Sequence, residues 1–252
     1  MRDHDLLVLS KSLDGTPLAL GIEDGQIAYV GPEPVAGGRS TLDHRDGFVL
    51  PGWIDAHVHF NEPGRSHWEG LETGSRALAA GVGTVFFDMP LNSSPPVLDA
   101  AAFLEKKRLA EEKSCLDFAL WGGLTPDSLD HLEEMAGEGA IGFKAFLCPS
   151  GLDEFAFADE ETLRRGMEIA ADLHLPISVH AELEPSSQPD RCDMAAWLAS
   201  RPIQLELDAI SLALDLAGET GCALHVVHVS SPEGIDLISA AKKKGVDVTA
   251  ET

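Results

Sequence analysis

The sequence predicts an α/β protein: a (β/α)8 barrel of the TIM type that stops after about seven strands, preceded by a small N-terminal β domain. The first fifty residues show short apolar strands joined by turns, whereas from Pro51 onward apolar runs of strand length alternate with stretches of helical period. The second pattern is typical of βα units on a parallel sheet. Polar and histidine residues end several of these strands, where barrel enzymes build their active sites. We therefore expect a β-sandwich part over 1–50 and the barrel over 51–252.

The N-terminal domain is predicted from its turn signals. Apolar stretches at 5–10 and 17–31 are separated by a turn at Gly15, and Asp24-Gly25 interrupts the second stretch. A loop that contains Pro34 follows them. Short strands bounded by such residues indicate a small sheet.

Seven apolar segments, bounded by Gly, Pro or polar residues, are predicted as the barrel strands. The stretches between them carry apolar residues three or four apart and are predicted as helices. The strands are expected at 52–60, 82–90, 115–124, 140–148, 175–182, 222–231 and 246–252, and the helices at 68–80, 98–113, 127–137, 159–173, 203–219 and 232–244. No residues remain for an eighth strand and its helix, so we expect either a fragment or a barrel that another chain completes.

A doubly wound open sheet is the alternative architecture. It is less favoured because no Gly-rich phosphate loop follows the first barrel strand. Potential ligands also end several different strands, whereas an open sheet gathers its ligands at one switch point.

Composition excludes several classes of protein. The chain has 18 Lys+Arg against 42 Asp+Glu, a formal net charge of −24, so a nucleic acid would be repelled. At 44% hydrophobic and 24% charged residues it can bury a core, which argues against disorder, collagen and coiled coil. Neither a signal peptide nor a membrane span is predicted, because no apolar run approaches the roughly 20 residues that a span needs. We expect a cytoplasmic protein without a membrane partner.

The cysteines predict reduced thiols. They are far apart, with no C-x-x-C pair, at Cys115, Cys148, Cys192 and Cys222. This spacing fits neither a disulfide framework nor a thiolate metal site. A metal ion would therefore be held by histidine or carboxylate-type ligands.

The most informative segment is Asp55-Ala-His57-Val-His59, at the end of the first barrel strand. Side chains two apart on a strand point to the same side, so His57 and His59 can face one metal ion. Such a pair is also compatible with a purely structural role. The residues at the other strand ends are needed to distinguish the two roles.

Lys144 lies within the otherwise apolar strand Gly-Phe-Lys-Ala-Phe-Leu. Burying an ammonium there is costly unless its charge is removed or paired. One interpretation is a lysine that snorkels to the barrel rim. The other is a neutral amine that has reacted with carbon dioxide to give a carbamate able to bridge two metal ions, and the residues alone leave both open.

Two further strands close with a histidine, His180 and His228. Four histidines and a lysine at the ends of four strands indicate a site for zinc or a similar divalent ion, which can lower the pKa of bound water to about 7. His225 lies three residues before His228, so we expect it to point away and to serve packing. No role is assigned to the remaining histidines, His4, His44, His67, His131 and His174.

The second barrel strand ends with two more candidates. Asp88 is interpreted as a structural or supporting acid as readily as a catalytic one. Asn92 offers both a hydrogen-bond donor and an acceptor, which suits a cyclic amide.

Taken together, five segments resemble the cyclic amidohydrolases, and within that family most of all the allantoinase group. The similar segments are Pro51-Gly-Trp-Ile-Asp-Ala-His-Val-His-Phe-Asn-Glu-Pro-Gly-Arg65, Trp68-Glu-Gly, Asp88-Met-Pro-Leu-Asn-Ser-Ser-Pro-Pro96, Gly142-Phe-Lys-Ala-Phe-Leu147 and His225-Val-Val-His-Val-Ser-Ser-Pro-Glu-Gly234. Ser200-Arg-Pro with Glu206 is also similar to that group.

The resemblance implies a binuclear metal site. In this family the two histidines of H-x-H and a carboxylated lysine bind one metal ion, the same lysine and two later histidines bind a second, and a hydroxide bridges them. Zinc is expected, with cobalt, manganese or iron as alternatives, and the family expectation is a homotetramer. Carried over by matching motif, the ligands are His57, His59, Lys144, His180 and His228. The family's general base, an Asp at the end of the eighth strand, has no counterpart here.

The substrate is also inferred from the resemblance. Dihydroorotases usually carry Arg two residues after the second His, where this chain has Asn61. The missing Arg argues against a carboxylated ring, so we expect hydrolysis of allantoin to allantoate in purine breakdown, with Asn61 and Asn92 in contact with the substrate. Dihydroorotase or dihydropyrimidinase/hydantoinase activity is the alternative, as is a truncated, non-catalytic homologue.

Overall fold

The computed structural model of the protein describes residues 3–186 and 192–252. The chain divides into two compact units, Met1–Trp53 and Ile54–Thr252. In the described residues every helix is too short or too polar to span a bilayer.

The N-terminal unit is a four-stranded sheet in the order β3-β2-β1-β4. Strands β1 (His4–Lys11), β2 (Pro17–Glu23) and β3 (Gln26–Gly31) pair antiparallel, and β4 (Gly38–Phe48) lies parallel to β1. Asp24 and Gly25 have positive φ angles of 50° and 75°, which a tight two-residue hairpin turn requires. Strand β4 was not predicted, because its side chains are nearly all exposed and show no apolar alternation.

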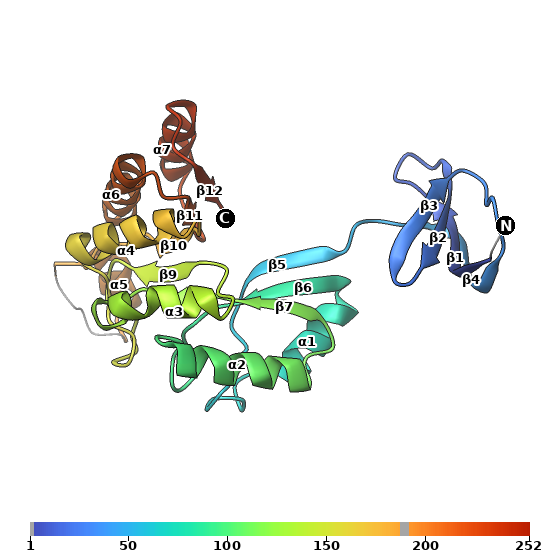
Figure 1. Ribbon diagram of the computed structural model, residues 1–252. Coiled ribbons are helices and arrows are strands. Elements are labelled where there is room, and N and C mark those ends of the chain that lie inside the picture. The colour runs from blue at the N-terminus through green and yellow to red at the C-terminus, as the bar shows by residue number, and fades with distance from the viewer. Residues whose placement is uncertain (1–2, 187–191) are drawn as a thin grey trace. The chain divides into compact units, whose positions relative to one another are not determined.

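The larger unit contains the strands of the barrel, each close to a predicted segment (Figure 1). Three of them, β5 (Trp53–Val58), β6 (Gly83–Asp88) and β7 (Asp117–Leu120), form one sheet. The other five are β8 (Gly122–Gly123), β9 (Phe143–Phe146), β10 (Ile177–His180), β11 (Leu224–Val226) and β12 (Val248–Ala250). Neighbours follow chain order, and the pairs from β8 to β12 are parallel. The predicted α/β class and strand order are confirmed.

The third predicted strand is split in two at Trp121. The Trp121 amide donates to the carbonyl of Asp88 on β6, whereas the next amide, of Gly122, donates to Gly142 beside β9. The segment thus leaves one sheet and joins the other within two residues. Gly122 is required there, because a Cβ would lie 2.8 Å from the Phe143 ring.

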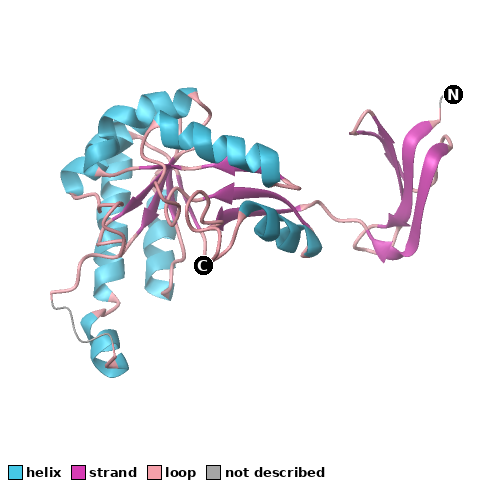
Figure 2. Ribbon diagram, turned by 90° about the horizontal axis from the view of Figure 1, so that it is seen from below, coloured by secondary structure: helices cyan, strands magenta, loops and turns pink. Residues whose placement is uncertain are grey.

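Helices lie on the outer side of the strands (Figures 1 and 2). The predicted ones are observed as α1 (Leu71–Ala80), α2 (Ala100–Lys113), the 3₁₀ helix η1 (Pro126–His131) with α3 (Leu132–Gly137), α4 (Glu160–Asp172), α6 (Gln204–Thr220) and α7 (Pro232–Lys243). A short helix α5 (Met194–Ser200) was not predicted; it has only seven residues, and none of them is buried in the described structure.

Capping residues fix where the long helices begin. The side chains of Asp99, Asp159 and Ser231 accept hydrogen bonds from backbone amides three residues ahead, at the starts of α2, α4 and α7. The inner faces of α4, α6 and α7 pack on β9 to β12 in one apolar core that includes Phe143, Ile177 and Val226. This packed layer sets the strand ends in place.

Candidate metal centre

Four imidazoles from three strands meet where those strands end. The ring of His57, on β5, lies with its centroid 5.4 Å from that of His59 and 5.8 Å from that of His228. The centroids of His180, at the end of β10, and His228, two residues beyond β11, are 4.6 Å apart. The structure therefore brings together four of the five residues that the sequence predicted as metal ligands.

His180 and His228 face each other through nitrogen atoms. Nδ1 of His180 lies 2.9 Å from Nε2 of His228. Burial and then the neighbouring His228 lower the pKa of His180 to about 3, and burial also lowers the pKa of His228. Both rings are therefore neutral at pH 7, and each can offer one lone pair. Nitrogens bound tetrahedrally at about 2.0–2.1 Å from one ion would lie roughly 3.3 Å apart, so the pair fits neighbouring ligands.

His59 carries a buried ring nitrogen that is available to a ligand. Its Nδ1 is buried and makes no hydrogen bond within the described residues. Burial, followed by repulsion from His57, lowers the pKa of His59 to about 4. A buried, neutral nitrogen that makes no hydrogen bond leaves a polar group unsatisfied, which a bound ion would correct.

Lys144 lies in β9 with 1% of its surface exposed. Its Nζ has no hydrogen-bond partner in the described structure. Burial lowers the pKa of Lys144 to about 7, although the carboxylate of Glu251 opposes the change. The amine does not snorkel to the rim, so that interpretation is wrong. A neutral buried amine is the form that can react with carbon dioxide, and the donor set as a whole fits a site for divalent ions.

Two residues of the site were missed from the sequence. The carboxylate of Glu251, just beyond β12, contacts Nδ1 of His57 and lies 3.5 Å from Nε2 of His225. Burial alone would raise the pKa of Glu251, but the hydrogen bond and charge of His57 outweigh burial and lower it. The signal that could have found Glu251 is alternation, since it lies two residues after Thr249 and so on the same side of the chain.

The interpretation of His225 as a packing residue is wrong. Its Nδ1 lies 2.8 Å from the hydroxyl of Thr249 on β12, on the side of Glu251. The strand ends at Val226, and His228 has a φ angle of +40°, so the alternation assumed between the two histidines is interrupted by a turn. His225 and His228 can therefore lie on the same side.

Asn61 and Asn92 lie in the loops that follow β5 and β6. Both have positive φ angles, 52° and 68°, a conformation that asparagine tolerates better than most residues. Arg65 joins the loops: its amide donates to the Asn61 carbonyl at 3.0 Å, and its Nη1 donates to the Asn92 carbonyl at 3.4 Å. Oδ1 of Asn61 is buried without a hydrogen-bond partner in the described residues, which leaves an acceptor for a ligand.

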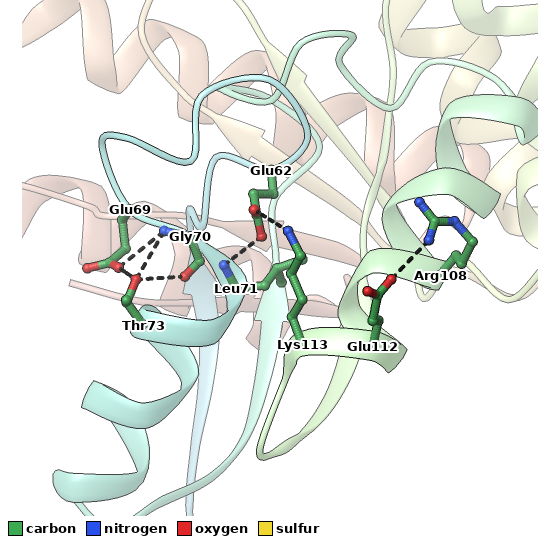
Figure 3. Close-up of polar contacts among 8 residues, drawn as sticks. All are labelled: Glu62, Glu69, Gly70, Leu71, Thr73, Arg108, Glu112 and Lys113. Atoms are coloured by element: carbon green, nitrogen blue, oxygen red, sulfur yellow. Dashed lines mark hydrogen bonds and ion pairs between the residues drawn. The ribbon is translucent and has the colours of Figure 1, made fainter.

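Glu62 fixes the first of these loops, as Figure 3 shows. One carboxylate oxygen accepts from the Leu71 amide at 3.0 Å, at the start of α1, and the other lies 2.8 Å from Nζ of Lys113, at the end of α2. Glu62 is only 7% exposed. The residue next to Asn61 is therefore held between two helices.

Asp88 holds the backbone at the start of the same loop. Its Oδ1 accepts from the Phe60 amide at 3.1 Å, and its Oδ2 lies 3.0 Å from Nζ of Lys106, which also donates to the Met89 carbonyl at 2.8 Å. Both charged side chains are fully buried. Burial raises the pKa of Asp88, and the charge of Lys106 opposes that rise. The structure gives Asp88 the supporting role rather than the catalytic one.

A cavity of about 270 Å³ opens beside His180 and His228. Its polar lining includes Glu182, Arg201 and Glu206. Glu206 accepts from both the amide and the hydroxyl of Ser230, at 2.6 and 2.7 Å, which ties the start of α6 to the loop after β11. The cavity gives a small molecule access to the imidazole cluster.

Known proteins share this sequence and fold. The chain matches the Amidohydrolase family over residues 48–251. It is 48% identical to an allantoinase of Rubrobacter xylanophilus, over 92% of this chain and 53% of the relative, and 51% identical to one of Deinococcus radiodurans, over 92% and 54%. An L-hydantoinase structure from Arthrobacter aurescens is similar with a TM-score of 0.87 and 32% identity, over 100% of this chain and 58% of that one. The chain spans about half the length of the curated relatives it matches.

Proposed function

Because the chain belongs to the amidohydrolase family, we propose that it carries the metal-binding part of an enzyme that hydrolyses a cyclic amide, with allantoin as the substrate and allantoate as the product. The observation that supports this most is the buried amine of Lys144, which makes no hydrogen bond within the described residues, together with the cluster of four imidazoles. The relatives named allantoinase support the choice of substrate.

Five residues would hold the two ions. We assign His57, His59 and a carboxylated Lys144 to one ion, and the same lysine with His180 and His228 to the other. Lys144 becomes a ligand when its neutral Nζ forms a bond to the carbon of carbon dioxide and releases one proton, which gives an anionic carbamate. When bound, zinc or a similar divalent ion polarises a carbonyl and supplies a nucleophile from water at neutral pH.

The chain's own side chains orient these ligands and the substrate. Glu251 accepts from Nδ1 of His57, which fixes the tautomer so that Nε2 carries the free lone pair. The buried Oδ1 of Asn61 can accept a ring N–H, and Asn92 offers an amide on the neighbouring loop.

Hydantoin opening is the second candidate, because the solved L-hydantoinase shares this fold at 32% identity. Dihydroorotate is less favoured, since Asn61 offers no positive charge to a ring carboxylate. We also propose zinc as the metal, a homotetramer as the assembly and the cytoplasm as the location.

The test is metal content measured by elemental analysis on protein grown with zinc and bicarbonate, together with assays on allantoin, hydantoin and dihydroorotate. Two ions per chain are expected, with loss of both in Lys144→Ala and no loss in His174→Asn, a control at an exposed histidine outside the site. Wild-type protein without bound metal, or equal metal content in Lys144→Ala, would overturn the assignment. Two ions without turnover would leave the centre intact but point to the non-catalytic homologue.

A further inference from the structure

The ends of β9 and β10 place two further metal-binding groups, Cys148 and Glu182, beside His180. These strands pair in parallel with His180 opposite Phe146, so the residues two positions later, Glu182 and Cys148, are also neighbours. The cysteine is buried and lies outside the imidazole cluster described above. Its spacing in the sequence gave no sign of a metal site, because the partners come from another strand.

The three ligand atoms are already close together. Oε2 of Glu182 lies 3.8 Å from Sγ of Cys148 and 3.4 Å from Nε2 of His180, and all three atoms lie within 4.8 Å of one another. Ligands bound tetrahedrally at zinc distances would be separated by roughly 3.3–3.6 Å. Small side-chain movements would therefore bring them around one ion.

We propose that Cys148, His180 and Glu182 form a second site, which shares His180 with the proposed centre, for a thiophilic divalent cation, zinc or cadmium. Sulfur with imidazole and carboxylate selects such ions over magnesium or calcium. The thiol proton is released to solvent as the sulfur–metal bond forms, and water fills the fourth position. The cavity beside His180 and Glu182 provides the entry path.

Glu182 is oriented for this role by Arg201. The guanidinium lies 3.4 Å from Oε1 of Glu182 and stacks over the Trp197 ring at 3.6 Å. Holding Oε1 in this way directs Oε2 toward the sulfur and the imidazole. The carboxylate is thus fixed before the cation binds.

Filling this site competes with the proposed centre for His180. Nδ1 of that ring faces His228, whereas Nε2 faces Glu182. A neutral imidazole has one lone pair and one N–H, so an ion bound at Nε2 places the proton on Nδ1 and removes His180 from the pair with His228. Inhibition by excess thiophilic metal follows, and this consequence alone rests on the proposed function.

The test is titration of the whole chain with cadmium, followed by ultraviolet absorption of the cadmium–thiolate bond. The centre proposed above contains no thiolate and gives no such band. Substituting the exposed Cys115 and Cys192 by Ser gives the background. In this background we expect a saturable band whose amplitude corresponds to one thiolate per chain and which is lost in Cys148→Ser. Cys222→Ser is the matched control, because that buried sulfur donates to the backbone carbonyls of Leu175 and Ala223, and it should keep the band.

Glu182→Gln distinguishes the three-ligand site from cadmium bound by the Cys148 thiol alone. It keeps the cysteine, and we expect the cadmium affinity to fall at least tenfold. A band that persists in Cys148→Ser, or an unchanged affinity in Glu182→Gln, would overturn the site. If cadmium binds but leaves hydrolysis unchanged, the competition for His180 is refuted. A chain without turnover would contradict the proposed function, but the cadmium titration would still test the second site.

Discussion

Replacing Lys106 by methionine should destabilise the barrel unit and loosen the loop that carries His59 and Asn61. Lys106 and Asp88 are fully buried and 3.0 Å apart, and Asp88 also accepts from the Phe60 amide. Methionine keeps most of the apolar stem of lysine and removes the charge. The carboxylate of Asp88 is then left without its counter-ion in a site that water does not reach.

The size of the effect follows from that unpaired charge. Removing one partner of a buried ion pair costs about 3–5 kcal/mol in the free energy of unfolding, whereas removing both charges together is often close to neutral. Lys106→Met should therefore lose about 3–5 kcal/mol, and adding Asp88→Asn should recover at least about 2 kcal/mol of it. The asparagine can still accept from the Phe60 amide.

Urea unfolding followed by circular dichroism at pH 8 and pH 5 measures both quantities. Burial already raises the pKa of Asp88, and without Lys106 the rise is greater. An acid with a raised folded-state pKa loses stability as pH rises through that value, so the deficit of Lys106→Met should be smaller at pH 5. Arg108→Met, which breaks an exposed i,i+4 ion pair with Glu112 on the same helix, is the control and should cost much less. A deficit below 1 kcal/mol, or no recovery in the double variant, would refute the reasoning.

Three further changes test the site. Glu251→Gln should weaken zinc binding about 10- to 100-fold in a chelator competition, because His57 loses its orienting carboxylate; equal affinity would contradict this. The stability of the wild type should rise between pH 7 and pH 9, because the pKa of Lys144 falls from 10.5 to about 7 on folding and the unfolded chain therefore binds more protons in this range. Thermal unfolding should show that Lys144→Met lacks this rise. Glu62→Ala should cost about 1–3 kcal/mol in urea unfolding, because the Leu71 amide and Lys113 lose their acceptor; Glu112→Ala, at an exposed residue that pairs with the exposed Arg108, is the control.

The candidate ligands on the strands could be proposed from the sequence because two local rules apply to them. Side-chain alternation placed His57 and His59 together, and the cost of a buried ammonium singled out Lys144. Both rules depend only on residues within one strand. The same limitation explains the errors: β4 is polar and is defined only by its pairing with β1, and α5 has no buried face.

The supporting residues could not be predicted in this way because their partners lie far along the chain. Glu251 meets His57 across 194 positions, and Lys106 meets Asp88 from a helix whose apolar period gives no sign of a buried charge. Cys148 and Glu182 become neighbours only through the register of β9 and β10. Such pairings require the order of strands in space.

The contact between Glu251 and His57 joins the last strand to the first. His57 lies on β5 in one sheet, and Glu251 follows β12 at the far edge of the other, so one ligand of the centre is oriented only when both ends of the strand series are folded. Metal affinity must therefore depend on the packing of β12 by α7, which begins at the Ser231 cap. Ser231→Ala removes that cap, three residues beyond His228, at a cost of about 1 kcal/mol. If the argument holds, this variant lowers zinc affinity along with stability, whereas removal of the Asp99 cap of α2 at the same cost lowers affinity less.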